Sequence, residues 1–166
     1  MTHEYILWIA MLVYGLKTIE EYLLDWRSWA VAVLKFDMTW SIFALMNGAV
    51  ITLGVSCAAV GWSLPAYALV LPALMLINAT FFHLLPFLRS RGRFSPGLIT
   101  AVLLFYPIAA WAYYGAHLDG VLTGETVAVS FILAATLQAF PIILLRLRRL
   151  PYFDQTRVSG KESADR

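Results

Sequence analysis

Five long apolar stretches constrain the fold of this chain more than any other feature. A helix needs about 20 consecutive apolar residues to cross the hydrocarbon core of a membrane. The stretches that reach this length run from about Glu4 to Leu23, Thr39 to Val60, Leu64 to Leu88, Pro96 to Tyr114 and Glu125 to Leu145. Only 13% of the 166 residues are charged, whereas soluble domains carry about 25%. The sequence therefore predicts an all-α, polytopic membrane bundle of five transmembrane helices.

The segments between and after these stretches complete the predicted organisation. Asp25 to Met38 contains two tryptophans among charged residues, which is typical of a short helix lying in the membrane interface. We expect residues 1–149 to form one transmembrane domain. Residues 150–166 are mostly polar, and this composition predicts a disordered cytoplasmic tail.

Basic residues predict the orientation of the bundle. The cytoplasmic loops of membrane proteins are enriched in Lys and Arg. The basic residues in the loops and directly after the last stretch are Arg27, Lys35, Arg89, Arg91, Arg93, Arg146, Arg148 and Arg149. With five spans they all fall on one side, which predicts an N-terminus outside and a C-terminus in the cytoplasm, in the plasma (inner) membrane. The net charge of +2 is too small and too dispersed to indicate a nucleic acid partner.

Three charged residues near the end of the first stretch are the main functional signal. Lys17, Glu20 and Glu21 follow a long apolar run. Ionisable groups inside a membrane are costly unless they are paired, so they are candidates for function. Lys17 can balance one carboxylate four residues away, but it cannot balance two.

Every other stretch carries a polar residue at a similar depth. Glu20, Glu21 and His83 are the candidate catalytic residues. The candidate substrate-binding residues are Tyr14, Lys17, Asn47, Asn78, Thr100 and Gln138. In a straight α-helix Asn78 and His83 lie about 140° apart, so both can face one site only if the helix deviates. Pro86 predicts such a deviation, since it removes a backbone hydrogen bond.

Two functions fit these residues. The first is an enzyme that performs acid/base chemistry, isomerisation or cyclisation, on an isoprenoid-like or sterol-like membrane lipid. The second is a non-catalytic lipid-binding or membrane assembly protein, whose polar residues specify helix packing. The partner in both cases is a membrane lipid or lipophilic small molecule, and the oligomeric state stays open.

The sequence also resembles the HXXEE-domain family of small bacterial membrane proteins. The resemblance rests on the Glu20-Glu21 pair, on Asn78 to His83 and on Phe94 to Ala101. This family has no assigned activity. Its pattern of histidines and carboxylates suggests a metal site, but Lys17 occupies the position of the first histidine. Because an ammonium group is a poor ligand, we expect no metal and no other cofactor. A looser architectural likeness is to small five-helix isomerases of the emopamil-binding type and to membrane terpene cyclases.

Overall fold

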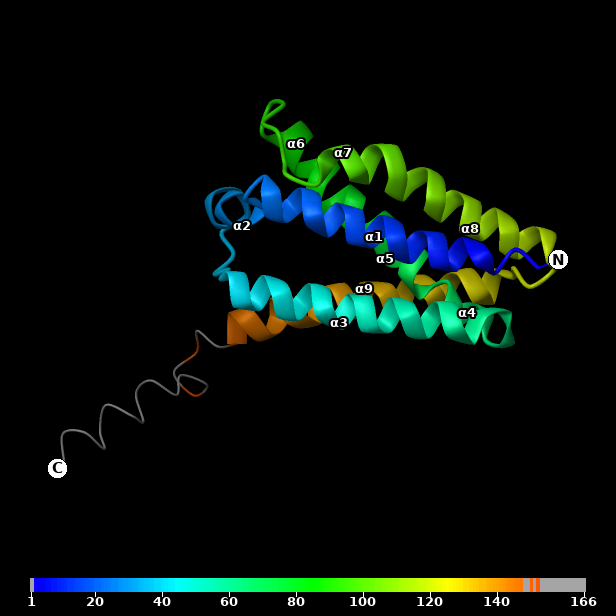
Figure 1. Ribbon diagram of the computed structural model, residues 1–166. Coiled ribbons are helices and arrows are strands. Elements are labelled where there is room, and N and C mark those ends of the chain that lie inside the picture. Colours follow the sequence, from blue (N-terminus) through cyan, green and yellow to red (C-terminus); the bar gives the residue numbers. More distant parts are fainter. Residues whose placement is uncertain (1, 148–149, 151, 153–166) are drawn as a thin grey trace.

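The computed structural model describes residues 2–147, 150 and 152, which form helices packed lengthwise against one another (Figure 1). The helices are α1 (Tyr5–Leu23), α2 (Trp26–Trp29), η1 (Ala30–Leu34), α3 (Trp40–Val60), η2 (Gly61–Ser63), α4 (Pro65–Ala68), α5 (Val70–Asn78), η3 (Ala79–Leu84), α6 (Leu85–Arg89), α7 (Leu98–Thr100), η4 (Ala101–Phe105), α8 (Tyr106–Leu118) and α9 (Gly124–Leu147). The predicted tail, residues 150–166, lies outside the described residues except for Leu150 and Tyr152.

Four continuous helical stretches are long and apolar enough to cross a membrane. They are Trp40–Ser63, Pro65–Arg89, Leu98–Leu118 and Gly124–Leu147, and they coincide with four of the five predicted spans. Helix α1 packs against α3 and α8 along the same bundle, but it contains three charged residues near its end. The all-α membrane bundle is confirmed, and the fifth span stays a prediction.

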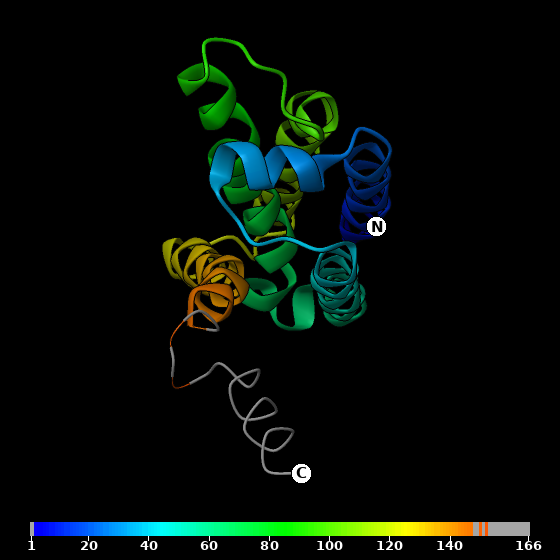
Figure 2. The same cartoon turned by 90° about the vertical axis from the view of Figure 1, so that its left-hand side faces the viewer.

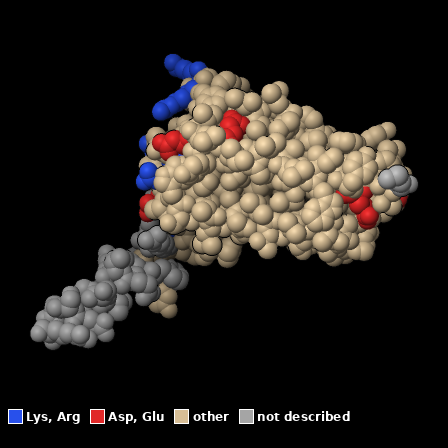
Figure 3. All heavy atoms as spheres, in the orientation of Figure 1, with Lys and Arg blue, Asp and Glu red and all other residues tan. Residues whose placement is uncertain are grey.

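The stretch Pro65–Arg89 forms the centre of the bundle. In its most apolar part 61% of the residues are buried, against 11% for Gly124–Leu147. Helix α5 contacts α1, α3, α8 and α9, which surround it in the end view (Figure 2). Figure 3 shows charged side chains mainly at the two ends of the visible face, with a broad band of other residues between them. This distribution is typical of a helical membrane protein.

Two of the helical stretches contain a π-helical segment that ends shortly before a proline. The π-helix η3 ends at Leu84, two residues before Pro86, and η4 ends at Phe105, two residues before Pro107. Proline cannot donate a backbone hydrogen bond, and a π-helix pairs residues five apart. Asn78 and His83 are five apart, so η3 brings them toward the same side of the helix.

The predicted interfacial helix is shorter than expected and covers one end of the bundle. It runs from Trp26 to Leu34, as α2 and η1, and stops where Lys35 adopts a left-handed backbone with φ of 58°. Trp26 and Trp29 are buried in a cluster with Met38 and Phe43. This end of the bundle, over which α2 lies in Figure 2, is called the α2 end below.

A hydrogen-bonded cluster joins three segments at the opposite end of the bundle. Asp119 Oδ2 accepts bonds from the backbone N–H of His3 (2.6 Å) and from Trp62 Nε1 (2.7 Å), and Asp119 Oδ1 lies 2.6 Å from Nδ1 of the His3 ring. Glu4 accepts a further bond from the Trp62 backbone N–H. The backbone bond from His3, then the His3 ring and Trp62, lower the pKa of Asp119 from 3.8 to about 2.

Because the folded state lowers this pKa, Asp119 stabilises the fold above about pH 4, and its contribution is lost as the pH falls toward 2. We predict that Asp119→Asn lowers the melting temperature at pH 7 and reduces the further loss between pH 5 and pH 2.5. Thermal unfolding in detergent, followed by circular dichroism, measures both effects. Asp37→Asn, at an exposed site, is the control. Equal acid sensitivity in wild type and Asp119→Asn would contradict the prediction.

Candidate functional site

A cavity lies between α1, α3, α5, η3 and α9, beneath α2. About 70 Å³ of it is open to the centre of a water molecule, and one water needs about 10–15 Å³ of such volume. The cavity therefore has room for several waters or for part of a hydrocarbon chain. Six candidate site residues line it, namely Tyr14, Lys17, Glu21, Asn47, Asn78 and Gln138. Most of the remaining lining is aromatic or aliphatic.

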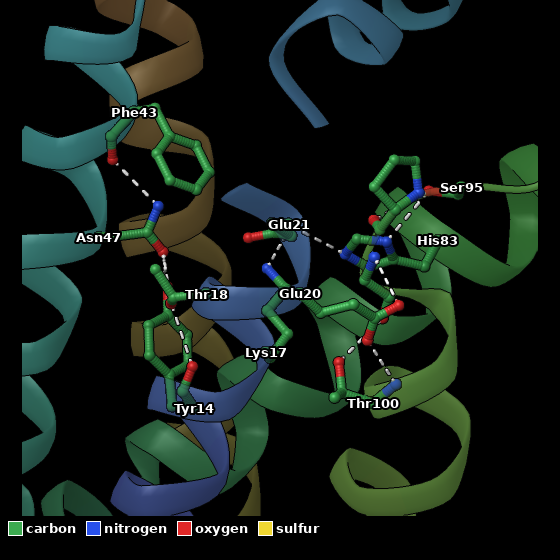
Figure 4. A network of polar contacts seen from close by, with 12 residues as sticks. Tyr14, Lys17, Thr18, Glu20, Glu21, Phe43, Asn47, His83, Ser95 and Thr100 are labelled. Carbon is green, nitrogen blue, oxygen red and sulfur yellow. Dashed lines mark hydrogen bonds and ion pairs between the residues drawn. The ribbon is translucent and has the colours of Figure 1, made fainter. Parts of the chain in front are cut away.

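The charged part of the wall consists of Lys17 and Glu21, and His83 lies behind them (Figure 4). Lys17 Nζ is 2.6 Å from Glu21 Oε1, and His83 Nε2 is 3.4 Å from the same oxygen. These side chains are 3%, 2% and 0% exposed. Lys17 and Glu21 are four residues apart on α1, and this spacing brings their side chains into contact on the helix surface.

The second oxygen of Glu21 is oriented differently. In Figure 4 it points away from His83, toward the side of Asn47 and Phe43. Within the described residues it accepts no hydrogen bond, whereas Oε1 is the oxygen in contact with Lys17 and His83. Glu21 therefore presents one anchored oxygen and one that is open to a ligand in the cavity.

A tight loop holds His83 in place, and sequence reasoning gave no role to its residues. His83 Nδ1 lies 3.1 Å from Ser95 Oγ, and Ser95 is fully buried. Gly97 has a φ of 88°, and a Cβ there would lie 2.7 Å from His83 Cε1 and 2.9 Å from Glu21 Cγ. Only glycine fits this backbone and this close approach.

The structure separates the two carboxylates of α1. Glu20 does not line the cavity. Its Oε1 accepts bonds from the backbone N–H groups of Gly97 (3.0 Å) and Ile99 (3.3 Å), and its Oε2 accepts one from Thr100 (2.9 Å). Glu20 thus caps the start of α7, where backbone donors lack partners within the helix. Thr100 belongs to this cap and is also absent from the cavity wall.

Asn47 connects α1 with α3 on the other side of the cavity. Its Oδ1 accepts bonds from Tyr14 (2.9 Å) and Thr18 (3.2 Å), and its Nδ2 donates to the Phe43 carbonyl. Asn47 and Phe43 also line an apolar surface groove between α1 and α3. They therefore form the boundary between this groove, which faces outward, and the internal cavity.

The donor set gives no indication of a metal centre. Among the described residues, no three His, Cys, Asp or Glu side chains come together as possible ligands. The oxygen of Glu21 nearest to His83 is already in contact with an ammonium group, which would repel a cation. The arrangement is suited to proton transfer and to binding an apolar molecule.

Comparison with known proteins identifies a family but no activity. Residues 7–112 match a family described as "Protein of unknown function with HXXEE motif". This region is more than half of the chain, and it includes most of α1, the π-helix η3 and the loop around Gly97. No curated protein and no solved structure matches the chain.

We predict that Gly97→Ala destabilises the protein by about 1–3 kcal/mol more than Gly120→Ala, because the added methyl group overpacks the site. Both glycines have positive φ, but a Cβ at Gly120 would meet nothing within 4 Å. Gly120→Ala therefore measures the backbone effect alone. Thermal or denaturant unfolding in detergent compares the variants. Equal losses of stability in Gly97→Ala and Gly120→Ala would show that the close approach to His83 and Glu21 does not affect the free energy of unfolding.

Proposed function

The chain belongs to the HXXEE family of proteins of unknown function, and we propose that it binds a lipophilic molecule in the cavity and transfers protons on it. The proposed substrate is isoprenoid-like or sterol-like, and the reaction is an isomerisation or cyclisation. The observation that carries this proposal is the position of Glu21. It is 2% exposed, and it lies on the cavity wall with one oxygen anchored and the other free.

The proposed reaction begins in the uncharged form of the Lys17–Glu21 pair, in which a proton has moved from the ammonium group to the carboxylate, so that Glu21 is a carboxylic acid. The O–H bond breaks and a C–H bond forms at one alkene carbon, which leaves a carbocation in the substrate. Lys17, 2.6 Å from Oε1, stabilises the carboxylate that is formed. The carboxylate then takes a proton from a neighbouring carbon. The double bond has moved, or a ring has closed, and Glu21 is protonated again.

Other residues of the wall support this chemistry. Phe36, Phe43 and Phe82 line the cavity, and aromatic rings stabilise cations near their faces. His83 lies between Glu21 (3.4 Å from Nε2) and Ser95 (3.1 Å from Nδ1), close to the exposed residues 91–94. We assign to His83 the exchange of protons between Glu21 and solvent. Glu20 is a positioning residue, because it holds the loop that packs on His83 and Glu21.

We further propose that α1 is a fifth span, that the bundle lies in the plasma membrane, and that its α2 end is on the cytoplasmic side. Lys17 and Glu21 neutralise each other inside the bundle, which lowers the cost of placing α1 in a membrane. Basic side chains cluster on the visible face at the α2 end (Figure 3), as the positive-inside rule requires of a cytoplasmic side.

A non-catalytic function is the second candidate. It is favoured by the charge balance of Lys17 with Glu21 and by the backbone bonds of Glu20, since both join elements of the bundle. In this case the polar residues specify packing, and the cavity binds a lipid without changing it.

Deuterium incorporation distinguishes the two functions. We predict that wild-type protein, incubated in D₂O with the lipid that copurifies with it, introduces deuterium at a carbon of that lipid. Glu21→Gln should abolish incorporation, because an amide cannot transfer the proton. Glu125→Gln, at an exposed carboxylate at the start of α9, is the control. Mass spectrometry of the extracted lipid measures the label. Lipid bound by wild type without any label would support the non-catalytic function.

A double substitution tests whether the charges are needed for folding. We predict that Lys17→Met combined with Glu21→Leu keeps or raises the melting temperature in detergent, because apolar side chains often replace a buried ion pair without loss. Lys17→Met alone should destabilise, since it leaves Glu21 uncompensated. If the double variant loses several kcal/mol of stability, the charges serve the fold, and the catalytic proposal loses its main support.

A further inference from the structure

One wall of the cavity contains a buried acceptor without a partner. Asn78 lines the cavity and is 8% exposed, and its Oδ1 accepts no hydrogen bond within the described residues. Most buried polar atoms are paired, and an unpaired one is unfavourable. Asn47, the other asparagine of the wall, differs because its oxygen accepts two bonds. Asn78 is therefore available to a ligand.

The covering helix contributes an unpaired donor. Trp26 lines the cavity and is 8% exposed, and its Nε1 has no acceptor within the described residues. A ligand that satisfies both groups must donate one hydrogen bond and accept another. A hydroxyl group does both, whereas an ether or a ketone only accepts.

Among the described residues, the cavity wall has no unpaired cation that could bind an anion. Within the part of the chain that the structure describes, Lys17 and Glu21 are the only charged residues that line the cavity, and they are paired. Two other cations, Lys35 and Arg146, line a second pocket with Asp37. This pocket shares Phe36, Ile142 and Leu145 with the cavity. A phosphate or carboxylate inside the cavity would lie next to Glu21 without a free counterion, which is unfavourable.

We propose that the cavity binds an uncharged lipid alcohol, whose hydroxyl group pairs with Asn78 Oδ1 and Trp26 Nε1 while its hydrocarbon part contacts the aromatic lining. This assignment rests on the proposed function, because it names the substrate class for the same site. An uncharged ligand excludes two classes of anionic lipid from the cavity: fatty acids, and the diphosphate esters of isoprenoid alcohols.

The test compares four ligands with one hydrocarbon chain: farnesol, its methyl ether, the corresponding hydrocarbon and farnesyl diphosphate. Binding to the full-length protein in lipid nanodiscs is measured with radiolabelled ligand. We expect farnesol to bind about tenfold more tightly than the ether or the hydrocarbon, as one or two hydrogen bonds allow. The diphosphate should bind more weakly than farnesol.

Two variants and one control locate the hydroxyl group. Asn78→Leu should reduce the affinity for farnesol about tenfold and leave hydrocarbon binding unchanged. Trp26→Phe should produce a smaller loss, of about threefold. Trp29→Phe is the matched control, because Trp29 is also buried, its Nε1 has no acceptor in the described part of the chain, and it does not line the cavity. If Asn78→Leu does not fold, the comparison of Trp26→Phe with Trp29→Phe still decides the question.

Three results would overturn this inference. Equal binding of farnesol and the hydrocarbon would show that the wall does not recognise a hydroxyl group. Tighter binding of the diphosphate, reduced by Lys35→Gln with Arg146→Gln, would place the polar end in the second pocket. Equal losses in Trp26→Phe and Trp29→Phe would indicate a general packing effect. Selective binding of farnesol without deuterium incorporation would support the lipid alcohol while contradicting the catalytic function.

Discussion

The ion pair between Lys17 and Glu21 is the interaction on which the rest of the site depends. Both groups are almost fully buried in the bundle. A single buried charge there would be strongly destabilising, and only a close partner offsets that cost. Because the partners are four residues apart on one helix, they pair without help from another element. His83 and the cavity wall can then be arranged around a neutral unit.

The backbone around this ion pair is shaped by prolines and one glycine. The π-helix η3, just before Pro86, turns Asn78 and His83 toward the same side, where a regular α-helix would separate them. Gly97 lets the next loop approach His83 and Glu21 closely, and Glu20 holds that loop by three backbone bonds. The neighbouring carboxylates of α1 therefore have different surroundings, one on the cavity and one on a helix start.

The sequence predicted the helices well because a run of about 20 apolar residues can be recognised from the local sequence alone. It also placed the polar residues at one depth, and six of the nine candidates line one cavity. It could not assign the directions of Glu20 and Glu21, since these depend on where the loop before α7 returns to the bundle. Ser95 and Gly97 lie in the segment that carries the family resemblance, but the sequence could not assign them a role for the same reason. The sequence also could not predict that Trp26 faces the cavity, because tryptophans near a membrane interface commonly lie at the membrane surface instead.

The lysine at position 17 distinguishes this chain from the motif for which its family is named. A histidine there, together with Glu21 and His83, would give the imidazole and carboxylate donors that transition metals prefer. Lysine instead supplies a positive charge 2.6 Å from the carboxylate oxygen that also faces His83. A fixed cation can stabilise a carboxylate as a metal would, but it leaves no open coordination position for a substrate. In our proposal the apolar wall and the unpaired groups of Asn78 and Trp26 therefore hold the substrate, which is why we expect it to be uncharged.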